Sequence, residues 1–207
     1  QAEVDRAQSP RAKADTIANR TKKTITEKMD EDPFFYRKFS ALLQQAIDDY
    51  KAQRISDAEY LKRVTEIMEQ VRDGKSQEAP DILKERDLSR ALFGALKEKM
   101  NPGGRAESSP TSGLREDPVE YRVSRPAPPD PMEQVLAGAA CDMEDIIRKH
   151  AVVRWRENVD AQNRMRNDLD DFLFRLQKEK GIPMSYEQMD AIIEAAIAIA
   201  IHRPDDV

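Results

Sequence analysis

A continuous stripe of apolar residues between positions 35 and 50 constrains the fold of this chain more than any other feature of its sequence. The stripe repeats every three to four residues, as one face of an α-helix does, and comprises Phe35, Phe39, Leu42, Leu43, Ala46, Ile47 and Tyr50. Asp32 and Pro33 precede it, and these residue types are favoured at the N-cap and at the first position of a helix. The pattern predicts an amphipathic helix that buries one side against other elements.

Similar patterns predict six further helices, and no run alternates with a period of two for long enough to indicate a sheet. The Ser56-x-x-Glu59 and Ser185-x-x-Gln188 patterns are capping boxes, and Gly74 and Gly181 are typical helix stops. Asp160 is the expected cap of its helix. The six predicted helices occupy residues 12–29, 56–74, 81–100, 132–150, 161–180 and 185–200. We therefore predict an all-α fold of about seven helices.

Residues 101–131 differ in composition from the rest of the chain. They contain seven of its twelve prolines, three of its seven glycines and four serines. Such a composition predicts a linker, or a strap that lies along the surface. We accordingly expect two helical bundles, an N-terminal one over residues 1–100 and a C-terminal one over 132–207, joined by this Pro/Gly/Ser-rich segment.

The charge balance and the cysteine count restrict the class of protein. The 34 basic and 39 acidic residues give a net charge of −5, which excludes a histone-like DNA coat. The only cysteine is Cys141, so no disulfide can form within the chain, and a cytoplasmic location is expected. The longest apolar stretch, 191–201, is too short to cross a bilayer. Because the chain begins with Gln1, we expect it to be a fragment of a longer protein.

Three short motifs resemble parts of nucleotide or nuclease sites but lack the context that such sites need. Gly74-Lys75-Ser76 looks like the end of a phosphate-binding loop, yet Glu69 stands where that loop requires a glycine. Asp49-Tyr50-Lys51 and Asp73-Gly74-Lys75 have the Asp-x-Lys spacing of a metal-dependent nuclease. Both precede Pro80-Asp81, however, and neither sits on a recognisable strand. We predict no cofactor site and no nuclease centre in this chain.

Other chemically suggestive residues have simpler structural interpretations. The pairs Asp48-Asp49 and Asp170-Asp171 point about 100° apart on a helix and are typical of a solvated face. Cys141 lies among alanines and is expected to be a buried thiol, while His150 ends a helix, where a cation is favourable. Trp155 is expected to anchor the connection 151–158, with base stacking as the open alternative. We predict no catalytic residue and no metal ligand.

Two stretches carry a local excess of positive charge. Residues 11–28 and residues 148–166 each contain six basic and two acidic residues. Such stretches can hold phosphates by releasing counterions, although an ordinary solvated helix face has the same composition. The candidate DNA-binding residues are Arg20, Lys22, Lys23, Lys28, Arg154, Arg156, Arg164 and Arg166.

Two separated segments carry a resemblance to a known family. The first contains Arg20-Thr21-Lys22-Lys23-Thr24-Ile25-Thr26-Glu27-Lys28-Met29-Asp30-Glu31-Asp32-Pro33, then Phe35-Tyr36-Arg37-Lys38-Phe39-Ser40, and continues with Arg54-Ile55-Ser56-Asp57-Ala58-Glu59-Tyr60-Leu61. The second contains Trp155-x-x-Asn158, Asp160, Met165-Arg166-Asn167 and Asp170-Asp171-Phe172-Leu173, with the helix from Ser185 following in the same order. Together these segments resemble the C-terminal helical region of the R (motor/endonuclease) subunit of type I restriction-modification enzymes. The resemblance covers roughly residues 20–100 and 135–200, and does not cover 101–131.

This resemblance implies a role in assembly. The parent subunit would use ATP and Mg²⁺ in other domains to translocate DNA and to cut it. The helical tail would dock the motor onto the methyltransferase and specificity subunits, and would contact double-stranded DNA in some arrangements. The chain by itself is then expected not to be an enzyme. The alternatives are a module that primarily binds DNA and a generic helical protein-interaction domain.

Overall fold

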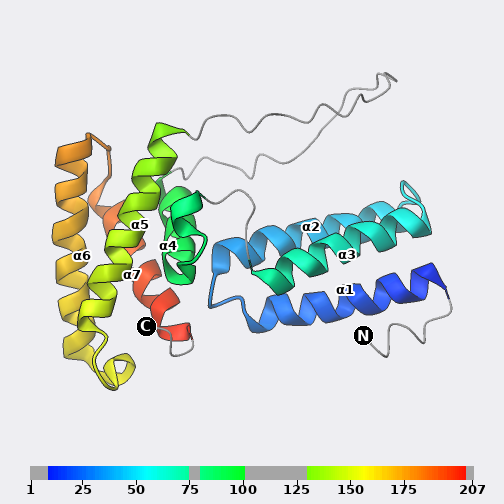
Figure 1. Cartoon of the computed structure of the whole chain (residues 1–207), viewed down its shortest axis with the longest axis horizontal. Helices are drawn as coiled ribbons and strands as arrows, with labels where there is room; N and C mark the ends of the chain where they lie inside the picture. The colour runs from blue at the N-terminus through cyan, green and yellow to red at the C-terminus, as the bar shows by residue number, and fades with distance from the viewer. Residues whose placement is uncertain (1–8, 75–79, 101–129, 204–207) are drawn as a thin grey trace.

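The computed structural model describes residues 9–74, 80–100 and 130–203, and these residues form helices and connecting turns without any strand. The described residues contain seven α-helices (Figure 1). In chain order they are α1 (Pro10–Glu27), α2 (Pro33–Lys51), α3 (Asp57–Asp73), α4 (Asp87–Met100), α5 (Pro131–His150), α6 (Val159–Lys180) and α7 (Tyr186–His202). Two short 3₁₀ helices, η1 (Asp81–Leu83) and η2 (Trp155–Glu157), precede α4 and α6. The predicted all-α class and number of helices are confirmed.

Side-chain caps fix where most of these helices begin. Asp32 accepts a hydrogen bond from the Phe35 amide at the start of α2, and Ser56 accepts one from the Glu59 amide at the start of α3. Ser185 and Gln188 form a reciprocal capping box on α7. Such bonds satisfy amides that have no partner within the helix. The predicted caps at these three starts are confirmed, but the capping box predicted at Ser56 is only half formed, because the Glu59 carboxylate pairs with Arg63.

Two predicted helix starts are wrong. α6 is capped by Asn158, whose side chain accepts hydrogen bonds from the Asp160 and Ala161 amides, so Asp160 lies inside the first turn. The segment predicted as one helix over 81–100 begins instead with η1, and α4 starts only at Asp87. Apolar spacing does not distinguish these starts, because the turn preceding α4 also buries an apolar side chain, Leu83.

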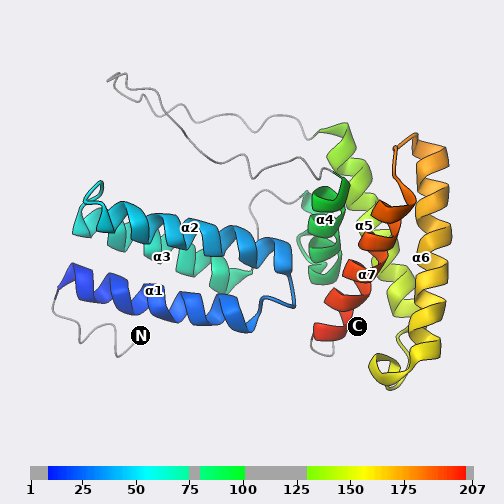
Figure 2. The same ribbon diagram turned by 180° about the vertical axis from the view of Figure 1, so that it is seen from behind.

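Helices α1, α2 and α3 lie side by side and enclose one hydrophobic cluster (Figures 1 and 2). The predicted stripe of α2 supplies Phe35, Phe39, Leu43 and Ala46, which are buried, while its other apolar members pack against the cluster. α3 contributes a buried Tyr60. The stripe at 35–50 therefore does face a core, as predicted.

Helices α4 to α7 surround a second, larger hydrophobic cluster. α4 supplies Leu88, Leu92 and Leu96 to it, and buried Trp155 belongs to it from the connection between α5 and α6. The sequence pattern assigns residues 87–100 to the N-terminal bundle, but their buried side chains belong with α5, α6 and α7. The pattern defines the apolar face of α4 without defining which helices cover it.

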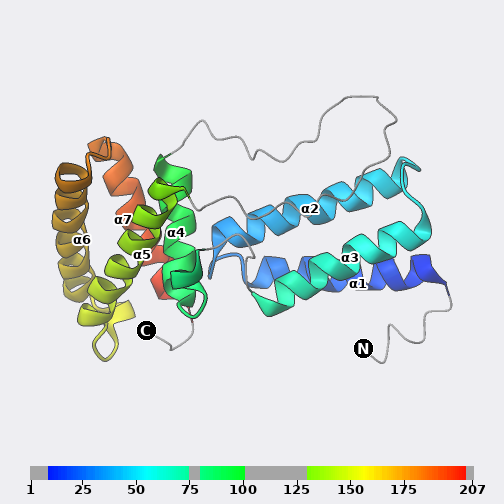
Figure 3. The same ribbon diagram turned by 45° about the horizontal axis from the view of Figure 1, so that its top comes forward.

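The two clusters meet where the start of α2 approaches α4 (Figure 3). Phe34 of α2 packs against the second cluster. A Cβ atom added to Gly94 of α4 would lie 2.9 Å from the Cβ of Phe34, so glycine is required for this close approach. Arg203 also bridges the two parts, since its Nε donates to the Glu31 carbonyl at 3.1 Å.

Two predictions concern the linker and the membrane. Most of the predicted linker 101–131 lies outside the described residues. Among the residues that the structure does describe, no helix combines the length and the apolar character needed to cross a bilayer.

Candidate functional site

The first group of candidate DNA-binding residues lies on α1 and just after it. Lys22 and Lys23 are exposed, and so is Arg20, which also interacts within the chain. Lys23 pairs with Glu27 at 3.7 Å and Lys28 pairs with Glu31 at 3.9 Å, while Lys22 forms no ion pair within the described part of the chain. Such exposed pairs are weak. These cations therefore stay accessible to an external anion.

Two of the four candidates in the second group help to hold the structure together. Arg156 lies over the Trp155 ring and donates to the carbonyls of Ile201 and Arg203 at 3.1 and 2.7 Å. Arg166 of α6 pairs with Glu194 of α7, with its Nε at 2.6 Å from the carboxylate. That contact lowers the pKa of Glu194. Arg156 thus joins η2 to the end of α7 and to Arg203, and Arg166 joins α6 to α7. Their positive charge alone does not reveal these structural roles.

The remaining two members of the second group are exposed. Arg154 adopts a left-handed backbone conformation with φ of 61° and pairs only loosely with Glu157, at 3.6 Å. Arg164 donates to the Asp160 carbonyl within its own helix. Figures 1 and 2 place α1 and the start of α6 on opposite sides of α4 and α7. The helices that carry these candidates thus lie apart, although Lys28 of the first basic stretch and Arg148 of the second line one common recess.

The turn that carries Arg154 also exposes apolar side chains. Val152, Val153 and Val159 are exposed, and Val153, at 90% exposure, is the most exposed large apolar side chain among the described residues. Val153 and Val159 line a shallow hollow of about 420 Å³. We call these three residues the valine tip. Single exposed apolar residues are ordinary, whereas a large contiguous apolar patch is typical of a surface that contacts another molecule.

The valine tip is anchored on both sides of its turn. Trp155 is buried and Asn158 caps α6. The side chain of Gln162 donates to the Arg156 carbonyl at 2.7 Å. A left-handed arginine costs free energy, so surrounding contacts of this kind must hold it in place. The structural role predicted for Trp155 is consistent with this packing.

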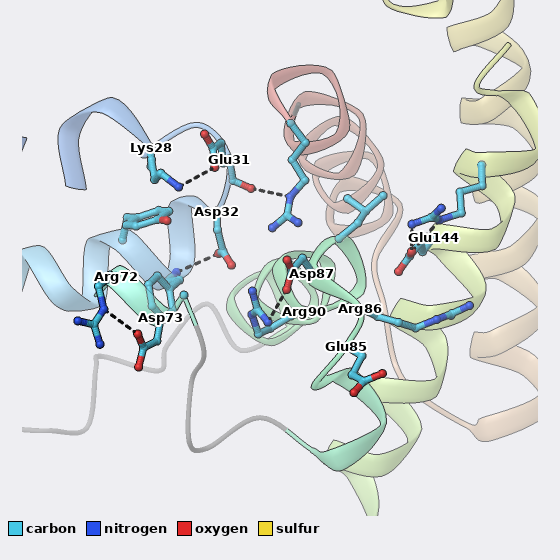
Figure 4. A pocket seen from close by; sticks show the side chains of 16 residues that line it. Lys28, Glu31, Asp32, Arg72, Asp73, Glu85, Arg86, Asp87, Arg90 and Glu144 are labelled. Carbon is cyan, nitrogen blue, oxygen red and sulfur yellow. Dashed lines mark hydrogen bonds and ion pairs between the residues drawn. The ribbon is translucent and has the colours of Figure 1, made fainter. Parts of the chain in front are cut away.

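A second recess lies between the α1–α2 turn, the end of α3 and the start of α4 (Figure 4). Its volume is about 750 Å³, and six basic and six acidic side chains line it. Most of these charges are paired locally, as Arg72 is with Asp73 at 3.0 Å and Lys28 with Glu31. We call this recess the charged cleft. Lys28 is the one DNA-binding candidate among its described lining residues.

Two residues of the charged cleft have unusual environments. Burial raises the pKa of Asp32, an effect opposed by its hydrogen bond from the Phe35 amide and by the nearby Arg203 and Arg90 charges. Burial lowers the pKa of Arg203, against the attraction of Asp32 and Asp87. Neither Asp32 nor Arg203 forms an ion pair with another described residue. Sequence reasoning assigns Asp32 only a capping role and does not single out Arg203.

Glu144 of α5 lies at the edge of the cleft and joins α5 to α4. It is 1% exposed and accepts hydrogen bonds from the amide and the hydroxyl of Ser89. Its other carboxylate oxygen accepts from Arg148 Nε at 2.8 Å. A buried carboxylate is tolerable only with such partners. Glu144 therefore caps the first turn of α4 from a neighbouring helix.

The other chemically suggestive residues occupy structural positions. Cys141 is buried, as predicted, and His150 lies 2.8 Å from the Asp168 carboxylate at the end of α5. Asp49 pairs with Arg54 and Arg63. In the described residues, no group of three or more potential metal-ligating side chains converges. Lys75 and Ser76, from the motif after Gly74, lie outside the described residues.

Comparison with protein-family models finds no match, and comparison with curated proteins and with solved structures finds no significant similarity.

Proposed function

We propose that this chain is a non-catalytic C-terminal module of the R subunit of a type I restriction enzyme. It docks the ATP-dependent, DNA-translocating endonuclease onto the methyltransferase and specificity subunits. The resemblance of two separated segments supports the family, because both occur in the expected order. The parent enzyme would use ATP and Mg²⁺ elsewhere, and the assembly would work in the cytoplasm.

The proposed module consists of two helical bundles, and the connection between α3 and α4, rather than the Pro/Gly/Ser-rich segment 101–131, joins them. The first bundle comprises α1, α2 and α3, and the second comprises α4 to α7, since each group shares one hydrophobic cluster. This division moves α4 from the N-terminal to the C-terminal bundle. The segment 101–131 then connects two helices of the same bundle, α4 and α5.

The observation that carries the docking role is the valine tip. Protein interfaces have an apolar centre with a polar rim, and Val153 and Val159 share their hollow with Arg154, Glu157 and Asp160. A rigid surface loses less conformational entropy when it binds. We assign the tip as the surface that contacts the methyltransferase and specificity core.

Co-elution of the chain with the purified core at micromolar concentration tests this assignment. We expect the wild-type chain to co-elute, and Val153→Asp and Val159→Asp to abolish co-elution while leaving the circular dichroism spectrum unchanged. Tyr186→Asp is the matched control, because Tyr186 is also a large exposed side chain, at 77%, and lies on a different element, α7. If the wild-type chain elutes separately from the core, the docking function is wrong. If both valine variants co-elute as the wild type does, the tip is not the docking surface.

A second candidate function is contact with double-stranded DNA, favoured by the exposed Lys22 and Lys23 on α1. Replacing both with alanine should weaken duplex binding and reduce the slope of its salt dependence by about one for each phosphate that the chain no longer neutralises. Arg154→Ala with Arg164→Ala tests the exposed part of the second stretch in the same way. Lys62→Ala on α3 is the control, because this exposed lysine lies outside both stretches. Unchanged binding and salt slope would exclude these residues from a DNA interface.

A further inference from the structure

We propose that the junction between the two helical bundles is a pH-sensitive hinge, and that Asp32 controls its opening. The junction lies where the start of α2 meets α4 and Arg203, around the charged cleft (Figure 4). In the closed form the buried carboxyl of Asp32 is protonated. In the open form water reaches this carboxyl, and it is ionised. The hinge does not depend on the docking function proposed above.

The contacts that hold the junction closed are small and partly polar. Phe34 is the one apolar side chain of α1, α2 and α3 that packs against the cluster of α4 to α7 in the described residues. Arg37 pairs with Glu98 at 3.2 Å, but both side chains are exposed, and such pairs are weak. Arg203 adds a hydrogen bond from its Nε to the Glu31 carbonyl. Domains with a small or polar interface move relative to each other, so a modest change in free energy is enough to open this junction.

Asp32 places a buried carboxyl at this junction. It is 5% exposed, and its Oδ1 accepts a hydrogen bond from the Phe35 amide at 3.1 Å. It forms no ion pair with any residue that the structure describes. A buried carboxylate without an ion pair loses hydration that one hydrogen bond does not replace. Burial accordingly has the largest influence on the pKa of Asp32 and raises it.

Three charged side chains face Asp32 from the second bundle. Arg203 and Arg90 favour its ionised form, whereas Asp87 opposes it, and the effect of burial on the pKa outweighs the two arginines. Arg90 is already engaged with Asp87, at 2.8 Å. Because arginine keeps its charge at all ordinary pH values, Asp32 is the group that titrates in this set. Separating the bundles removes both these charges and the burial that the second bundle imposes.

The other neighbours of Asp32 belong to its own bundle and move with it. Glu31 precedes it in the chain and pairs with Lys28 at 3.9 Å, so this charge acts on Asp32 in both forms. Burial, followed by the Glu31 and Asp32 charges, raises the pKa of Tyr36 to about 12, so the Tyr36 hydroxyl stays neutral at physiological pH. We therefore assign the pH dependence of the opening to Asp32.

The raised pKa determines the direction of this dependence. A carboxyl whose pKa is higher in the closed form than in water binds its proton more tightly there, so protons favour the closed form. The closed form is most favoured below the ordinary pKa of 3.8. The ratio of open to closed chains rises between this value and the raised pKa, and levels off above it. One proton is involved, so this ratio changes by at most about tenfold per pH unit.

Pulsed electron paramagnetic resonance on the whole 207-residue chain tests the hinge by measuring a distance between the bundles. Spin labels at Lys62→Cys on α3 and Glu179→Cys on α6 occupy exposed positions, and Cys141→Ala removes the native thiol. The labelled chain that keeps Asp32 should show one narrow distance at about pH 4 and gain a longer component at about pH 8. Asp32→Asn keeps an oxygen that can cap α2 but cannot ionise, so it should show the narrow distance at both pH values.

Two further variants make the result decisive. Asp190→Asn is the matched control, because Asp190 is exposed on α7 outside the cleft, and it should follow the pH dependence of the wild type. Asp32→Ser also provides a capping oxygen without a charge, and it replaces Asp32→Asn if that variant does not fold. A wild-type distance that is the same at both pH values would overturn the proposal. So would a lengthening at low pH, or the wild-type pH dependence in a folded Asp32 variant.

Discussion

At the scale of single residues, Glu144 is a buried charge with a full set of partners. It accepts from Ser89 and from Arg148, and its side chain is 2% exposed. Replacing it with leucine leaves the Ser89 amide and the Arg148 guanidinium without their acceptor. We expect Glu144→Leu to lower the free energy of unfolding by about 2–3 kcal/mol in urea denaturation. Asp145→Asn, in the same helix but exposed, should cost less than about 1 kcal/mol. Equal losses in the two variants would contradict this role.

Asp168 is expected to make the stability of the folded chain depend on pH in the acidic range. Its pKa lies below the ordinary value of 3.8, first because His150 hydrogen-bonds to its carboxylate and then because Lys149 does. Such a carboxyl contributes its full stabilisation when the pH is above its pKa in the unfolded chain. The stabilisation is lost as the pH falls through its pKa in the folded chain. Wild type should therefore be more stable than Asp168→Asn at about pH 6, and the difference should shrink at about pH 2.5 in urea titrations. A difference that grows on acidification would contradict the sign of this effect.

Residue types at helix ends were predictable because capping is a local interaction. Asp32, Ser56 and Ser185 each bond to an amide three residues ahead, so the sequence holds the whole motif. The partners of Arg156 and Arg166 were not predictable in this way. They lie 28 or more residues away, at Glu194 and at the carbonyls of Ile201 and Arg203, and only the packing of α6 and η2 near α7 brings them together.

At the scale of elements, Gly94 controls how closely α2 approaches α4. Alanine at this position would place its Cβ 2.9 Å from the Cβ of Phe34. We expect Gly94→Ala to lower the free energy of unfolding by about 1–2 kcal/mol, because overpacking outweighs the better helix propensity of alanine. Gly138 in α5 is the matched control, since its added Cβ would meet no atom within 4 Å.

Gly138→Ala should accordingly stabilise the chain by about 0.5–1 kcal/mol, through helix propensity alone. Thermal unfolding followed by circular dichroism measures both variants under identical conditions. If Gly94→Ala is stabilised as much as Gly138→Ala, the two helices do not approach as closely as the structure indicates.

The apolar stripes predicted the helices and their buried faces, but not their neighbours. α2 buries the predicted face, and α3 ends at Gly74 in the left-handed conformation that glycine favours. The stripe of α4 is equally clear, yet it packs against α5 and α7 rather than into the cluster of α1, α2 and α3. Periodicity shows that a helix has a face to bury, whereas the choice of partner depends on complementary shapes along the whole chain.

At the scale of the whole molecule, the two hydrophobic clusters lead us to expect that helices α4 to α7 fold without α1, α2 and α3. The cluster of α4 to α7 contains no fully buried residue from α1, α2 or α3 among the residues that the structure describes. We expect a fragment of residues 80–207 to keep its helical circular dichroism and to unfold cooperatively, because it retains that cluster. Non-cooperative unfolding of this fragment would mean that the packing of Phe34 against α4 is essential to the second bundle.

The charged cleft and the valine tip are products of the folded molecule. Asp32, Arg90 and Arg203 converge from three distant parts of the sequence, so no local motif identifies the cleft. The valines at 152 and 153 form a short apolar run in the sequence, and their exposure follows from the direction of the turn around buried Trp155. The charge excess of residues 11–28 was visible in the sequence, and its exposure on α1 agrees with either a solvated face or a phosphate contact.

Competition with the intact motor subunit tests the proposed docking role most directly. The chain, added in roughly hundredfold excess to a restriction complex reconstituted from the same system, should occupy the docking surface of the methyltransferase and specificity core. We predict a dose-dependent loss of ATP-driven DNA translocation that extra core restores and that the Val153→Asp variant does not produce. Undiminished translocation at saturating concentrations of the wild-type chain would contradict the docking role.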